Sequence, residues 1–128
     1  MHKSKIINII NKAYPKIAQH YNSNAKVELH NNIYERLSGI SEMSGDENPH
    51  AEYDWSENKI YIYTINMDSE EQVIRSLIHE CVHSVQNKEL FDAYYETPLT
   101  YFTHPYEIEA HYEEENWEKY KLNTISIG

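Results

Sequence analysis

Two histidines and a glutamate stand within five consecutive residues of this 128-residue chain, in the order His79-Glu80-Cys81-Val82-His83. On a helix, side chains four residues apart lie one above the other, with about 5–6 Å between their Cβ atoms. Two imidazoles placed in this way can bind one metal ion at about 2.0–2.1 Å. Glu80 lies beside the pair, where its carboxylate can accept a proton from a water that the metal polarises. The pattern predicts a hydrolytic metal site with His79 and His83 as ligands and Glu80 as general base.

A catalytic zinc site needs a third protein ligand and an open position. Downstream, the segment from residue 104 to residue 111 reads His-Pro-Tyr-Glu-Ile-Glu-Ala-His. We expect Glu107, 24 residues after His83 (107 − 83), to be the third ligand. At the start of a helix this carboxylate would also suit the helix dipole or a capping box, and Glu109 is the alternative ligand. His111 either orients a ligand or is a solvated histidine.

Helical periodicity predicts the elements that carry these residues. Residues 3–21 form a first helix, and Pro15 either kinks it or marks its true start. The central helix begins near residue 69, where Ser69 with Gln72, or Asp68 with Glu71, has capping-box spacing, and it runs to about Asn87. The apolar positions of the two helices are Ile6, Ile9, Ile10, Ala13 and Ile17 in the first, and Val73, Ile74, Leu77, Ile78, Cys81, Val82 and Val85 in the second. Cys81 is expected to be a core thiol and not a ligand.

Pro105 suits the first position of a last helix, which is expected to run to about Tyr120 after a cap at Thr103 or His104. Its expected packing residues are Ile108, Trp117 and Tyr120, and residues 113–115 are expected to be a solvated face.

Alternation and turn residues predict a small sheet. Residues 51–55 and 59–65 form a β-hairpin around a polar turn at 56–58, and the second arm is the best strand in the chain. Val27 with Leu29 and Ile33 with Leu37 are possible strand fragments, and residues 41–50 form a loop. The expected fold is α+β in a single domain over residues 1–128: an N-terminal helix, a small mixed or antiparallel sheet, the helix that carries the site, and a C-terminal helix.

These motifs resemble the gluzincin branch of the zincin-like metallopeptidases, in its minimal single-domain form, over roughly residues 51–120. In that family a glutamate on the helix after H-E-x-x-H is the third zinc ligand and commonly opens an E-x-x-A-D string. Here the match runs from Glu107 to His111, with histidine in place of the usual Asp or Asn. Metzincins are excluded, because Gln86 and Glu89 occupy their glycine and third-histidine positions.

The resemblance implies one zinc ion per chain and a peptide or protein substrate that pairs with an exposed edge of the strand at residues 59–65. A tyrosine would donate a hydrogen bond to the developing oxyanion. We expect this residue to be Tyr106, then Tyr101, with Tyr94 and Tyr95 as further candidates.

Composition narrows the class of function. A formal net charge of −10 disfavours binding to nucleic acid and to anionic membranes. The single cysteine rules out an internal disulfide, and the polar residues that interrupt the apolar run near the N-terminus argue against a signal peptide, so we expect a cytoplasmic protein. Two other functions stay open: a non-catalytic binding module on the same scaffold, and a zinc hydrolase that acts on a small amide.

Overall fold

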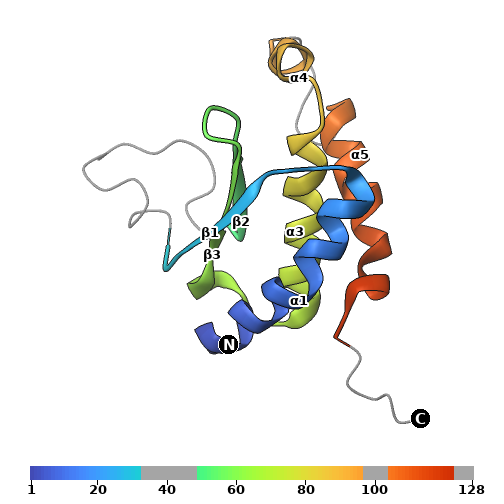
Figure 1. Ribbon diagram of the computed structural model, residues 1–128. Helices are drawn as coiled ribbons and strands as arrows, with labels where there is room; N and C mark the ends of the chain where they lie inside the picture. The colour runs from blue at the N-terminus through green and yellow to red at the C-terminus, as the bar shows by residue number, and fades with distance from the viewer. Residues whose placement is uncertain (33–48, 97–103, 123–128) are drawn as a thin grey trace.

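A computed structural model describes residues 1–32, 49–96 and 104–122 (Figure 1). The helices are α1 (Lys3–Tyr21), α3 (Glu70–Ser84), α4 (Lys88–Tyr95) and α5 (Pro105–Glu113), with 3-10 helices η1 (Thr64–Asn66) and η3 (Glu114–Tyr120). The strands are β1 (Lys26–His30), β2 (Ala51–Asp54) and β3 (Lys59–Tyr63). The chain is therefore a small mixed α+β fold, as the sequence predicted.

The three strands form one mixed sheet in the order β1-β3-β2. Strand β3 pairs in parallel with β1 and antiparallel with β2. The prediction of an exposed edge at residues 59–65 was wrong, because β3 is the central strand and its backbone is paired on both sides. The strand itself ends at Tyr63, where η1 begins. Strand β2 is an edge strand of the sheet, and it lies beside the candidate site.

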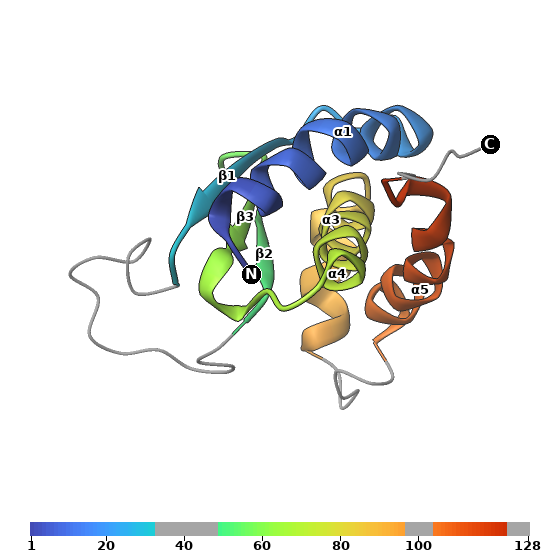
Figure 2. The same cartoon turned by 90° about the horizontal axis from the view of Figure 1, so that it is seen from below.

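Helix α1 packs across α3 and the sheet (Figure 2). Its five predicted apolar residues are all buried, which confirms the periodicity. The helix starts at Lys3 and continues through Pro15, so the proline does not mark its start. It ends at Tyr21, and the following cap residue, Asn22, adopts the left-handed conformation (φ 57°) that asparagine tolerates better than most residues.

Helix α3 lies between the sheet and α5, with α1 across one side (Figure 2). Its predicted N-cap is confirmed: the hydroxyl of Ser69 accepts a hydrogen bond from the Gln72 N–H, while the Gln72 side chain accepts one from the Asp68 N–H. The predicted apolar residues from Val73 to Val82 are buried in the main core with α1 and β3. Cys81 is a buried free thiol, as expected. Val85 is 48% exposed, because the helix ends at Ser84.

The C-terminal part differs more from the sequence prediction. Helix α4 was not predicted; Asn87, read as the end of the central helix, is the cap of α4 and accepts from the Leu90 N–H. The last helix starts at Pro105 with His104 as cap, as predicted, but becomes a 3-10 helix after Glu113. Tyr120 and Trp117 pack against the core as expected, whereas Ile108 is 52% exposed. The predictions for residues 33–48 and Thr103 lie outside the described residues.

No helix in the described ranges is both long enough and apolar enough to cross a bilayer.

Candidate metal centre

Helices α3 and α5 bring three side-chain atoms to one point. His79 Nε2 lies 3.1 Å from His83 Nε2, and Glu107 Oε1 lies 3.0 Å from the first and 2.6 Å from the second. The two histidines are one turn apart on α3, and Glu107 is the third residue of α5. All three residues are nearly buried, with side-chain exposures of 11% or less. The structure thus brings together the three residues that the sequence predicted as metal ligands.

The outer nitrogens of both rings have acceptors. His79 Nδ1 lies 2.7 Å from Glu114 Oε2, and His83 Nδ1 lies 2.6 Å from Gln86 Oε1. The amide NH₂ of Gln86 donates to the Tyr106 carbonyl at 3.1 Å and to Glu109 Oε1 at 2.9 Å, which fixes its oxygen toward His83. Each Nδ1 is therefore a donor, and a neutral ring then presents the lone pair of Nε2 to the interior.

The interior of the site therefore holds several hydrogen-bond acceptors and little positive charge. His83 Nε2 and Glu107 Oε1 lie only 2.6 Å apart, which is favourable when a proton or a cation lies between or beside them. His79 brings positive charge to this point in the metal-free chain. Burial lowers the pKa of His79, but hydrogen bonds to Glu107 and Glu114 outweigh it and raise this pKa to about 10.

Glu107 has the opposite shift. Burial raises the pKa of its carboxyl, but hydrogen bonds from His79 and His83 outweigh burial and hold this pKa well below its usual range. Glu107 is therefore an ionised carboxylate, the form that binds metals.

Two residues of this network were missed by the sequence analysis. Glu114 was predicted to be solvated, but its side chain is 15% exposed and holds His79. Gln86 connects the end of α3 to α5. Glu114 stands seven residues after Glu107 (114 − 107), two helical turns along the same face, and that spacing could have revealed it. The rest of the predicted solvated face is divided: Glu113 accepts from the Tyr21 hydroxyl at 2.8 Å, and Glu115 is 73% exposed.

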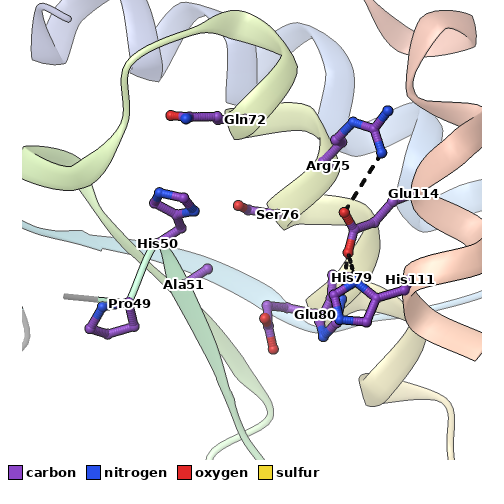
Figure 3. A pocket seen from close by; sticks show the side chains of 10 residues that line it. All are labelled: Pro49, His50, Ala51, Gln72, Arg75, Ser76, His79, Glu80, His111 and Glu114. Atoms are coloured by element: carbon purple, nitrogen blue, oxygen red, sulfur yellow. Dashed lines mark hydrogen bonds and ion pairs between the residues drawn. The ribbon is translucent and has the colours of Figure 1, made fainter. Parts of the chain in front are cut away.

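Glu80 lies beside the three converging atoms and lines two hollows of the surface. The first, of about 350 Å³, is lined mostly by polar and ionisable residues; besides Glu80 and His79 the lining residues are Pro49, His50, Ala51, Gln72, Arg75, Ser76, His111 and Glu114 (Figure 3). The second, of about 410 Å³, has aromatic walls; besides Glu80 and His79 it is lined by Pro49, Ala51, Glu52, Tyr53, Trp55, His83, Phe91 and Glu107. We call them the polar hollow and the aromatic hollow. Because both are lined by Pro49, Ala51, His79 and Glu80, they meet over Glu80 as one cleft between β2 and the helices.

The environment of Glu80 favours a carboxyl that holds and releases a proton. Burial raises its pKa, the positive charge of the nearby histidines lowers it, and the carboxylates of Glu107 and Glu52 raise it again, with a net increase. Figure 3 shows its side chain projecting from α3 toward the space beside Ala51 of β2.

The other candidates have different positions. Glu109 is exposed and bonded to Gln86, outside the group of converging atoms. His111 is half exposed, and its Nδ1 lies 3.0 Å from Glu114 Oε2, so it contacts the partner of His79. The rings of Tyr106 and Tyr94 pack against each other and against His104, and neither residue lines the two hollows. The oxyanion role of Tyr106 stays a prediction without support from its position. Tyr101 and the side chain of Tyr95 lie outside the described residues.

Comparison of the chain with protein-family models, with curated proteins and with solved structures returned no match.

Proposed function

We propose that this chain is a zinc-dependent peptidase of the zincin-like, gluzincin type, with His79, His83 and Glu107 as zinc ligands and Glu80 as general base. The observation that carries the proposal is the convergence of two imidazole nitrogens and one carboxylate oxygen, each ring held through its outer nitrogen. This donor set suits zinc. Ligands of a tetrahedral zinc at about 2.0–2.1 Å are about 3.3 Å apart, so separations of 2.6–3.1 Å need to widen by about 0.2–0.7 Å.

A zinc ion bound there would supply Lewis acidity, which polarises a carbonyl and makes a water more acidic. The residues of the chain would do the rest. Glu80 would accept the proton of the attacking water and pass it to the leaving amine, for which an elevated pKa is suited. Glu114 and Gln86 would keep His79 and His83 oriented.

The edge strand supports a peptide substrate over a small amide. The Tyr63 N–H donates to the His50 carbonyl at 3.0 Å, so in this antiparallel ladder Ala51 and Tyr53 direct their backbone N–H and C=O groups away from β3. Those groups face the cleft side of β2 and can pair with an extended peptide. A cleft with a hollow on each side of Glu80 also fits a chain that continues in both directions.

The decisive experiment separates metal binding from catalysis. Protein purified without chelator is expected to contain one zinc per chain by elemental analysis and to cleave peptides of a mixed library. Glu80→Gln should retain zinc and lose about 10²–10⁴-fold in rate, because it removes the base and keeps the ligands. His79→Ala and His83→Ala should lose both zinc and activity.

Glu118→Gln is the matched control, since it makes the same change at an exposed residue of η3 and should alter neither quantity. Zinc-free wild-type protein would contradict the metal assignment. Zinc-loaded protein that cleaves no peptide would favour a binding module.

A further inference from the structure

The two hollows of the cleft differ in chemistry in a way that bears on substrate choice. The aromatic hollow has the rings of Tyr53, Trp55 and Phe91 in its wall. Tyr53 and Trp55 meet edge to face at 4.9 Å, and Trp55 lies 5.4 Å from Phe91. Phe91 in turn lies 5.2 Å from the ring of His83. The aromatic wall therefore extends directly up to a proposed zinc ligand.

The polar hollow lacks such a wall. Apart from histidines, no aromatic residue stands among those that line it in the described ranges. Its cation, Arg75, is already within 2.8 Å of Glu71 and within 4 Å of Glu114 and Glu115. An aromatic side chain would therefore find rings to pack against on the aromatic side and none but histidines on the other.

The direction of β2 relates these hollows to the substrate. The strand runs from Ala51, which lines both hollows, toward Trp55, which lines the aromatic one. Antiparallel pairing is the slightly more stable kind. A peptide antiparallel to β2 runs the other way, so the residues before its scissile bond lie in the aromatic hollow and those after it lie in the polar hollow.

We infer that the hollow formed by Tyr53, Trp55 and Phe91 is the specificity subsite of the enzyme and binds an aromatic side chain on the amino side of the cleaved bond. This inference rests on the proposed peptidase function. The residues that select the substrate are then one from the strand, one from the turn after it and one from α4.

The test is a pair of peptides that differ only at the residue before the cleaved bond, phenylalanine in one and alanine in the other. For zinc-loaded wild-type protein, kcat/KM is expected to be at least about tenfold higher for the phenylalanine peptide, as for large apolar groups in a pocket that excludes part of their water. In Trp55→Ala and in Phe91→Ala the ratio between the two peptides should fall toward one. Tyr112→Ala, a change at a 71% exposed aromatic residue outside both hollows, should leave the ratio unchanged.

Zinc content and thermal unfolding of each variant verify that it is folded and loaded. Cleavage of both peptides at equal rates, a preference for lysine or arginine at this position, or a preference that appears only after the cleaved bond would overturn the inference and leave the peptidase proposal intact. A ratio unchanged in both variants would also overturn it. Failure to cleave any peptide of the library with zinc bound would overturn both.

Discussion

The hydrogen bond between His79 Nδ1 and Glu114 holds the ring so that Nε2 faces Glu107. Removing the carboxylate frees this ring and weakens its basicity. Glu114→Gln is therefore expected to lower zinc affinity by about 10–100-fold, as measured by competition with a chromophoric chelator. Glu118→Gln, which changes the charge equally in the same segment, is the control and should bind zinc like wild type. Equal affinities for both variants would show that Glu114 does not position the ligand.

A second prediction at the residue scale concerns protons. In the metal-free chain the pKa of His79 is about 10, so its Nε2 carries a proton at pH 7–9 that zinc has to displace. Binding in this range is expected to release about one proton per zinc, and the apparent affinity should rise about tenfold per pH unit until the pH approaches 10. Titration calorimetry in buffers of different ionisation enthalpy measures the number of protons released per zinc. A binding enthalpy that is the same in all buffers would contradict the protonated state of His79.

At the scale of elements, α3 is the support of the site, because it carries His79, Glu80 and His83. The hydroxyl of Ser69 caps its first turn. Ser69→Ala should cost about 1 kcal/mol of unfolding free energy and, in a chain of this size, lower Tm by about 3–5 °C. Calorimetry or circular dichroism measures both quantities. Ser4→Ala in the exposed first turn of α1 is the control and should change stability by less than about 0.5 kcal/mol.

The elements that the sequence predicted are those with local signals. The apolar periodicity of α1 and α3 and the caps at Ser69 and His104 are readable because each depends on residues a few positions apart. The parallel pairing of Lys26 with Lys59 joins residues far apart in the chain, and a sequence carries no local mark for such a contact. The start of α4 was not predicted, because its cap residue, Asn87, is also a residue type found at the end of a helix.

The same distinction holds for the site. His79, Glu80 and His83 lie within one turn, so their relation follows from helix geometry alone. Glu107 was predicted because a catalytic zinc needs a third ligand and the next helix offers this carboxylate, and its Oε1 does lie 2.6 Å from His83 Nε2. Gln86 and Glu114 could not be assigned, since their contacts depend on how α5 and η3 lie against α3.

At the scale of the whole molecule, the three proposed ligands connect two helices, so zinc that binds only the folded chain stabilises it. Free zinc at 100 times its Kd should add about 2.7 kcal/mol, which is roughly 8 °C or more in Tm. Chelator should reverse the increase, and His83→Ala should show none. Thermal scans with and without zinc decide this, and a wild-type Tm that does not respond to zinc would contradict the site.

Helix α5 has little of its own to keep it in place, because the residues buried within its span are Ala110 and Glu107. The first contributes only a methyl group to the core, and the second is a proposed metal ligand. Local opening of this helix should therefore cost less free energy in the metal-free chain than in the metal-bound one. A ribosome delivers α1, the sheet and α3 before α5. The ion would then bind as the last step of folding, and a chain that fails to acquire it would expose its C-terminal helix to the proteases that remove incomplete proteins.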